Sequence, residues 1–229
     1  MISLILPYWD RVGVADAALE RLAQCYPDLG LQVIVVDDGN PTPYKVPASL
    51  AGRLQVDVVR LPEKREPKSP VTCWNAGFGA AKRDLIGISC VEVWHSRPVL
   101  KAMAVELDEL GPRGYVLAAA WCPELREWHC HSQHAAAGSY QLPKGTGRAF
   151  LGLMHRSLYE KAGGWDEDYR DGAGYEDVDF IHRMLKAGAK FRIRDDLVVN
   201  HPKTGASIAW GAEKFARNAE ILKRKWAHA

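Results

Sequence analysis

Residues 163–180, GGWDEDYRDGAGYEDVDF, contain seven carboxylates in eighteen positions. Glu176 and Asp177 stand at the expected start of a helix, where a carboxylate is fixed in position and can accept a proton from a hydroxyl. Gly172 and Gly174 would let the backbone approach another group closely. Acidic residues in the first turn of a helix are also favoured by the helix dipole alone. The segment is therefore either the acidic edge of an active site or a solvated turn.

A second pair of carboxylates, Asp37 and Asp38, follows the apolar stretch LQVIVV. These side chains could form hydrogen bonds to a nucleotide base or ribose, although Asp-Gly is also a common turn pair. The sequence has no G-x-x-x-x-G-K-[ST] and no G-x-G-x-x-G after the first strand, and GFGAAK lies within an expected helix. P-loop NTPases and dinucleotide-dependent dehydrogenases are therefore disfavoured.

Histidines and cysteines gather between residues 122 and 134. A zinc site could be drawn from three histidines and one of two cysteines. These residues are His129, His131, His134, Cys122 and Cys130. Their spacing lacks the regularity of structural zinc sites, so we expect a long polar loop over residues 122–147 that lines a substrate pocket. Long loops in compact domains tend to be functional or disordered.

Strands and helices that would position these groups alternate along the chain. Strands are expected at 2–6, 31–39, 54–62, 84–90, 115–121, 148–155 and 190–201. Helices are expected at 15–25, 69–82, 96–111, 157–163 and 175–187, with a final helix of about fifteen residues. This alternation predicts a mainly parallel α/β sheet with helices on both faces. Ligands bind at the carboxyl ends of such strands. Four polar side chains fall at these ends: Asp37, Asp38, Cys90 and Glu92.

Length and composition fit one globular domain. The 229 residues are 47% hydrophobic and 25% charged, and the formal net charge of +2 implies no general attraction to polyanions. Five cysteines without a C-x-x-C argue against a disulfide framework and for a reducing compartment. The start of the chain has the pattern of a strand rather than a signal peptide, and no apolar run has the length of a membrane helix. We therefore expect a soluble cytoplasmic protein without a transmembrane segment.

Four motifs occur in the order in which a known family carries them, over residues 1–201. ISLILPYWDR resembles an opening strand that usually ends Pro-Thr-Tyr-Asn-Arg, and VIVVDDGNP resembles a second strand that ends Asp-Asp-Gly-Ser. NAGFGAAKRDLIGIS resembles a helix Asn-x-Gly-x-x-x-Ala-x-Gly, with Arg83 in place of the last glycine. GGWDEDYRDGAGYEDVDFIHR resembles Gly-Gly-Phe-Asp-Glu followed by Gly-x-Glu-Asp, as also found in galactosyl- and N-acetylgalactosaminyl-transferases. The chain thus resembles the inverting family 2 nucleotide-sugar glycosyltransferases of the GT-A fold.

The resemblance implies a GT-A type, Rossmann-like, mainly parallel sheet in a single domain of residues 1–229. Residues 1–121 would bind the nucleotide sugar, and residues 122–229 would bind the acceptor and carry catalysis. Asp177 would be the general base, and Glu176 would bind the acceptor or orient the base. Nucleotide-binding residues would be Pro7, Tyr8, Asp37, Asp38, Asn75 and Cys90. Acceptor-binding residues would be Trp165, Asp166, Glu167, Trp128 and His131.

The metal motif of this family, Asp-x-Asp, is altered in this chain to Cys90-Val91-Glu92. Glu92 can still supply a hard oxygen ligand, so Glu92 and His201, with the donor diphosphate, would hold Mn²⁺ or Mg²⁺. His95 is a second candidate ligand, because some relatives carry Glu-x-x-His. Cys90 leaves the contact to the donor ribose and the metal requirement open.

These motifs predict a glycosyltransferase that moves a sugar from a nucleotide-diphospho-sugar, expected to be a UDP-sugar, to an acceptor hydroxyl by direct inverting displacement. One alternative is a relative that binds nucleotide sugars without catalysis. Another is a sugar-phosphate nucleotidyltransferase, which would need a glycine-rich basic loop after the first strand. The acceptor is expected to be a glycan or a hydroxymethylated DNA base, and a protein acceptor is also open. With a DNA acceptor, the basic final helix would bind the phosphates through Lys214, Arg217, Lys223, Arg224 and Lys225.

Overall fold

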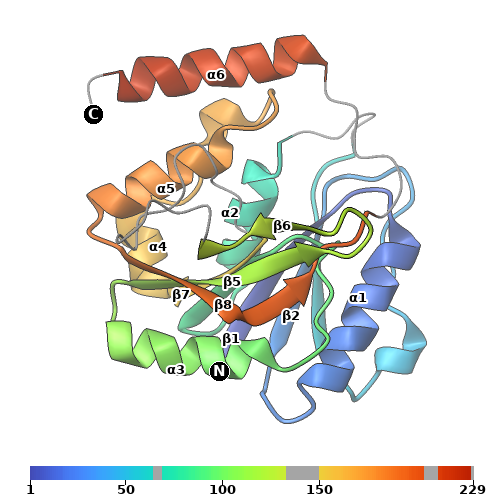
Figure 1. Cartoon of the computed structure of the whole chain (residues 1–229). Coiled ribbons are helices and arrows are strands. Elements are labelled where there is room, and N and C mark those ends of the chain that lie inside the picture. The colour runs from blue at the N-terminus through green and yellow to red at the C-terminus, as the bar shows by residue number, and fades with distance from the viewer. Residues whose placement is uncertain (64–68, 133–149, 204–210, 228–229) are drawn as a thin grey trace.

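The computed structural model describes residues 1–63, 69–132, 150–203 and 211–227, and contains one mixed sheet with helices on both faces (Figure 1). The strands are β1 (Ile2–Tyr8), β2 (Gln32–Asp37), β3 (Gln55–Arg60), β4 (Leu85–Ser89), β5 (Gly114–Cys122), β6 (Glu127–Cys130), β7 (Leu151–His155) and β8 (Lys190–Asn200). The α-helices are α1 (Val12–Cys25), α2 (Val71–Ala80), α3 (Val99–Leu110), α4 (Arg156–Ala162), α5 (Glu176–Lys186) and α6 (Ala212–Trp226). Two short 3₁₀ helices are η1 (Ala48–Leu50) and η3 (Glu167–Tyr169).

The sheet has the order β3-β2-β1-β4-β7-β5, and β6 and β8 both pair with β5. β1 to β4 are mutually parallel, and β8 is parallel to β5. β7 runs antiparallel to both β4 and β5, and β6 runs antiparallel to β5. The mainly parallel sheet predicted from the sequence is therefore confirmed, with β7 antiparallel between β4 and β5 and β6 antiparallel beside β5.

Two apolar layers cover the two faces of this sheet. In β1, Leu4 and Leu6 pack into the layer that holds α1 and α3, whereas Ile5 packs into the layer that holds α2, α4 and α5. Strands buried on both faces need apolar side chains at successive positions, which explains the unbroken apolar runs in the sequence. α6 packs on the outside of the second layer, against η3 and α5 (Figure 1).

The expected loop over residues 122–147 is wrong in its first part. Residues 127–130 form the strand β6, which pairs antiparallel with the end of β5. A strand of four residues with two aromatic or imidazole side chains carries too short a pattern to be recognised from its periodicity. Residues 133–147 of the expected loop lie outside the described residues.

The helices of the described residues are short or amphipathic. None of them combines the length and the apolar character that crossing a lipid bilayer requires.

Candidate active site

A pocket of about 150 Å³ lies beside the carboxyl end of β4 and the start of α5. Glu176 and Asp177 both line it, so the structure brings the two predicted catalytic carboxylates to one cavity. Cys90, which directly follows β4, and Trp165 also line it. The remaining lining residues are Pro70, Trp74 and Phe150. The site thus forms at the edge of the sheet where ligands of parallel α/β folds bind.

The two carboxylates are the first two residues of α5. One oxygen of Glu176, Oε2, is buried without a hydrogen-bond partner. Burial, together with the negative charge of Asp177, raises the pKa of Glu176 from 4.5 to about 7. Asp177 Oδ1 accepts a hydrogen bond from the amide of Val178 at 2.8 Å. Glu176 therefore keeps its proton at pH values at which an ordinary glutamate is ionised.

Stacked aromatic rings form one wall of the pocket. Trp165 stacks on Trp74, with ring centroids 5.6 Å apart, and on Phe180, with centroids 4.2 Å apart. The indole Nε1 of Trp165 is buried without a partner. Sequence reasoning missed Trp74 and Phe150, because a buried aromatic residue in a helix or before a strand looks like an ordinary core residue. The position of Trp74 beside Asn75 was the available signal.

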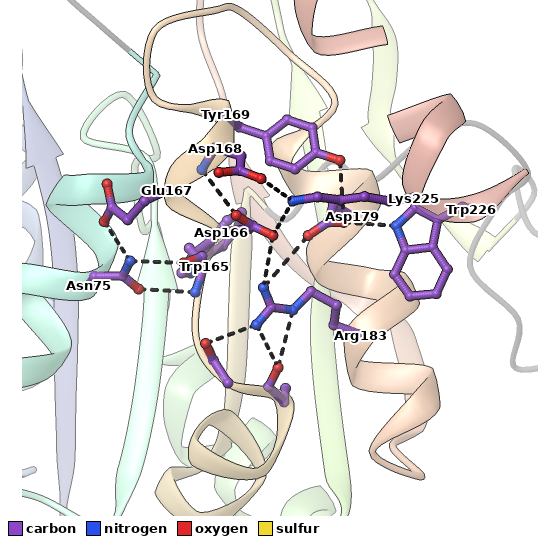
Figure 2. Close-up of polar contacts among 12 residues, drawn as sticks. Asn75, Trp165, Asp166, Glu167, Asp168, Tyr169, Asp179, Arg183, Lys225 and Trp226 are labelled. Carbon is purple, nitrogen blue, oxygen red and sulfur yellow. Dashed lines mark hydrogen bonds and ion pairs between the residues drawn. The ribbon is translucent and has the colours of Figure 1, made fainter. Parts of the chain in front are cut away.

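Asn75 on α2 holds the segment that carries Trp165. Its Nδ2 donates to the carbonyl of Trp165 at 2.9 Å and to Glu167 at 2.7 Å (Figure 2). Its Oδ1 accepts from the amide of Trp165 at 3.0 Å and from the hydroxyl of Tyr159 at 2.8 Å. Glu167 also accepts a hydrogen bond from Thr72 Oγ1 at 2.7 Å. The structure therefore gives Asn75 and Glu167 a role in packing, and their contacts to donor and acceptor stay predictions.

Asp166 is also engaged within the protein. Its carboxylate pairs with Lys225 of α6, and with Arg183 of α5 at 3.5 Å (Figure 2). Burial alone would raise the pKa of Asp166, but the hydrogen bond from Lys225 and the charges of both cations lower it overall. Lys225 also pairs with Asp168 at 2.9 Å. In the structure the Asp166 carboxylate is part of an internal ion pair, and acceptor binding by Asp166 stays a prediction.

Asp179, one turn into α5, is buried and joins three elements. It accepts hydrogen bonds from Trp226 Nε1 of α6 at 2.8 Å and from the hydroxyl of Tyr169 at 3.3 Å (Figure 2). In the acidic segment 163–180, Asp166, Asp168 and Asp179 thus hold α5, α6 and η3 together, whereas the pair Glu176-Asp177 faces the pocket.

Asp37 at the end of β2 is buried and shapes the loop that follows. It accepts hydrogen bonds from the amide and side chain of Asn40 at 3.0 and 2.7 Å, and from the amide of Tyr44 at 2.9 Å. Arg60 pairs with it at 2.8 Å. Burial opposes the ionised form, but these donors lower the pKa of Asp37 overall.

Pro7 and Tyr8, at the end of β1, lie in register with Val36 and Asp37 of β2. The amide of Asp38 donates to the carbonyl of Tyr8 at 3.0 Å, so these candidates meet at one edge of the sheet. Their contact with a nucleotide base stays a prediction. Asp38 directly follows the end of β2.

The altered metal motif is occupied by an ion pair. The carboxylate of Glu92 pairs with the guanidinium of Arg11, which precedes α1. Burial, followed by the charges of Glu92 and the pocket carboxylates, raises the pKa of the Cys90 thiol, which therefore stays protonated. A protonated thiol is a poor ligand for a hard cation.

The histidine candidates contact other side chains of the protein. His201 Nδ1 lies 3.1 Å from Nδ1 of His129, and its ring packs on Phe150. His95 is buried, with its Nδ1 2.7 Å from the hydroxyl of Tyr26. Within the part of the chain that the structure describes, no group of three or more His, Cys, Asp or Glu could hold a metal ion. The set of Glu92 and His201, completed by the donor diphosphate, has fewer protein ligands than such a group and stays a prediction, and His134 of the zinc alternative lies outside the described residues.

Trp128 and His131, predicted to bind the acceptor, come from β6 and the residues after it. Trp128 packs on Trp121 and on His131, with ring centroids 4.9 and 4.5 Å apart. His131 Nε2 lies 3.6 Å from a carboxylate oxygen of Asp195. Neither residue lines the pocket of Glu176 and Asp177, and their role stays a prediction.

The mainly parallel α/β sheet with helices on both faces is similar to solved structures that include a mannosyltransferase, which confirms the GT-A-like fold predicted from the sequence. Residues 1–349 of TarS from S. aureus superpose with a TM-score of 0.77 at 15% identity, over 100% of this chain and 66% of that chain. The same fragment in complex with UDP-GlcNAc gives a TM-score of 0.76 at 16% identity, over 100% of this chain and 67% of that one. The mannosyltransferase PcManGT from Pyrobaculum calidifontis, in complex with GDP-Man and Mn²⁺, gives 0.65 at 15% identity over 97% of this chain and 64% of that one.

Among curated proteins, the pre-mycofactocin glycosyltransferase of Mycobacterium tuberculosis is 26% identical over 196 residues, which cover 81% of this chain. The chain spans 40% of the length of this relative. No protein-family model matches the chain.

Proposed function

We propose that this protein is an inverting glycosyltransferase that moves a sugar from a UDP-sugar to an acceptor hydroxyl, with Asp177 as the general base. The observation that carries the proposal is the pocket that brings Glu176 and Asp177 against the stacked rings of Trp74 and Trp165. The pocket takes residues from both 1–121 and 122–229, which fits a division into a donor-binding and an acceptor-binding half. The complex of TarS with UDP-GlcNAc supports a UDP-linked donor sugar.

The proposed reaction is a single displacement. Asp177 takes the proton of the acceptor hydroxyl as its oxygen forms a bond to the anomeric carbon of the donor sugar. The bond from that carbon to the diphosphate breaks, and its electron pair leaves with UDP. Because the oxygen attacks opposite the leaving group, the anomeric configuration inverts. Below its raised pKa of about 7, Glu176 is mainly protonated and can donate a hydrogen bond to an acceptor oxygen beside the base.

A glycan is the acceptor that the geometry favours over a modified DNA base. Of the five cations of the final helix, Lys225 pairs with Asp166 and Asp168, and Arg217 donates to the carbonyl of Asp168. Cations that are already paired within the protein contribute less to binding phosphates. The aromatic wall of Trp74 and Trp165 offers a sugar ring an apolar surface instead.

A transfer assay tests the proposed function. Purified protein is incubated with UDP-sugars and a panel of glycans, and UDP release and product are followed together. We expect transfer to a glycan with a product whose anomeric configuration, measured by NMR, is opposite to that of the donor. UDP-sugar binding without transfer or hydrolysis would favour a binding module without catalysis. Formation of a nucleotide sugar from a sugar phosphate would favour the nucleotidyltransferase.

Removal of divalent metal is expected to leave nucleotide affinity unchanged. Glu92, the remaining carboxylate of the altered motif, is already paired with Arg11, which supports donor binding through a side-chain cation rather than through a metal. Arg11 is the cation placed there, and its planar guanidinium can bind a carboxylate on one side and a phosphate on the other. Calorimetric titration with UDP in EDTA should match titration in Mn²⁺, and Arg11→Met should weaken binding by roughly 10- to 100-fold.

Arg53→Met is the matched control, because Arg53 pairs with Glu20 at 2.8 Å and lies just before the start of β3, at the other end of the sheet. It should bind UDP like the wild type. The expectation fails if binding requires Mn²⁺ and is lost in Glu92→Ala. That result would mean that the nucleotide itself assembles the metal site that the sequence predicts.

A further inference from the structure

The backbone that leads into α5 is held in an unusual conformation. Gly174 and Tyr175 have φ values of 67° and 69°, and Tyr175 is the N-cap residue directly before Glu176. A positive φ is normal for glycine, but for a bulky residue such as tyrosine it is strained and persists only where surrounding contacts impose it. The direction of Glu176 and Asp177 therefore depends on whatever holds this turn.

Asn218, on α6, is the side chain that holds it. Asn218 is fully buried, and its Nδ2 donates to the carbonyl of Gly174 at 2.9 Å and to that of Tyr169 at 3.1 Å. Its Oδ1 accepts from Arg217 at 2.9 Å. A Cβ atom added at Gly172 would lie only 2.0 Å from Asn218 Oδ1, so the loop backbone packs directly onto the amide. One side chain thus fixes both ends of the turn segment.

Other contacts of α6 fasten the same segment on both sides of this amide. The amide of Ala173 donates to the carbonyl of Lys214 at 3.2 Å, one turn before Asn218. Lys225 and Trp226, at the end of the helix, contact Asp166 and Asp179 (Figure 2). α6 lies on the outside of the fold, away from the sheet (Figure 1), so its contacts with segment 166–179 are its main attachment.

We propose that Asn218 is a positioning residue for the transfer reaction: by holding the Gly174–Tyr175 turn from α6, it aims Glu176 and Asp177 into the pocket. The inference rests on the proposed function for the roles of these two carboxylates. Asn218 itself does not line the pocket and acts only through the turn. A small displacement of catalytic groups costs about 10²-fold in rate.

The test is a pair of variants and their combination. Asn218→Ala should lower kcat by roughly 10- to 100-fold and leave the affinity for UDP unchanged, since the strand ends of β1, β2 and β4 are not contacted by Asn218. Tyr175→Gly alone should keep near wild-type kcat, because glycine adopts a positive φ without strain. In the double variant, kcat should be about tenfold higher than in Asn218→Ala alone. A glycine at position 175 adopts the positive φ without support from Asn218.

Ile221→Ala is the matched control, because Ile221 is a buried residue of the same helix that makes apolar contacts and no hydrogen bond to the turn. Asn218→Ala and Ile221→Ala should both lower the melting temperature. Only Asn218→Ala should lower kcat and speed amide hydrogen exchange of residues 172–179.

Two results would overturn the inference. One is a loss of kcat in Asn218→Ala that the glycine does not rescue. The other is equal kcat and equal exchange in the two alanine variants, which would make Asn218 a simple fastener of α6. Failure of the proposed function looks different. The wild type would then transfer no sugar to any acceptor, while the exchange of the turn would still respond to Asn218→Ala.

Discussion

Asp177→Asn is expected to lower kcat by about 10²–10⁴-fold, the range that a general base contributes. The variant keeps the size and polarity of the side chain but cannot take the proton of the acceptor hydroxyl. Asp177 lines the pocket at the first turn of α5, and its Oδ1 accepts from the amide of Val178, a contact that the asparagine oxygen can keep. The affinity for UDP should therefore stay the same. Steady-state kinetics with calorimetric titration measures both quantities.

Asp171→Asn is the control for this variant, because Asp171 is an exposed carboxylate of the same segment that pairs with Arg170. Its kcat should equal that of the wild type. The assignment of the base would be reversed if Glu176→Gln lost more of kcat than Asp177→Asn. Equal small losses in both variants would instead mean that neither carboxylate takes the proton.

The carboxylates of segment 163–180 have different roles in the structure. Asp166 and Asp168 pair with Lys225, and Asp179 binds Trp226, so three carboxylates of segment 163–180 help to attach α6. These contacts lie before and after the Gly174–Tyr175 turn, which leads into Glu176 and Asp177 at the pocket. The same segment therefore supplies both the proposed catalytic groups and the contacts that hold them in place.

The sequence allowed the sheet and the ends of its strands to be predicted because apolar runs of strand length alternate with helical periodicity. It also placed Glu176 and Asp177 at a helix start, which the structure confirms. The internal partners could not be predicted, because they come from far along the chain. Asp166 meets Lys225 59 residues away, and Glu92 meets Arg11 81 residues away. Local patterns carry no information about such pairs, so carboxylates used for packing and carboxylates used for chemistry look alike in the sequence.

Glu176→Gln is expected to remove the pH dependence that Glu176 confers on the protein. Burial and the charge of Asp177 hold the pKa of Glu176 at about 7 in the folded state, against 4.5 as its ordinary value. The folded protein thus keeps a proton that the unfolded chain releases, and the free energy of unfolding of the wild type falls as the pH rises from about 4.5 through 7. The difference corresponds to roughly 3 kcal/mol. Denaturant unfolding of the wild type and Glu176→Gln should therefore diverge over this range, with the variant the more stable at pH 8.

The kcat/KM of the enzyme should also depend on the protonation of Glu176. Ionised Glu176 would stand as a second negative charge beside Asp177 and close to the departing diphosphate, so kcat/KM of the wild type should fall as the pH rises through about 7. In Glu176→Gln this alkaline limb should be absent. A wild-type kcat/KM that rises through pH 7, with the rise lost in Glu176→Gln, would contradict the expectation. In that case Glu176, with a pKa matched to neutral pH, would itself be the general base, and Asp177 would serve to raise its pKa.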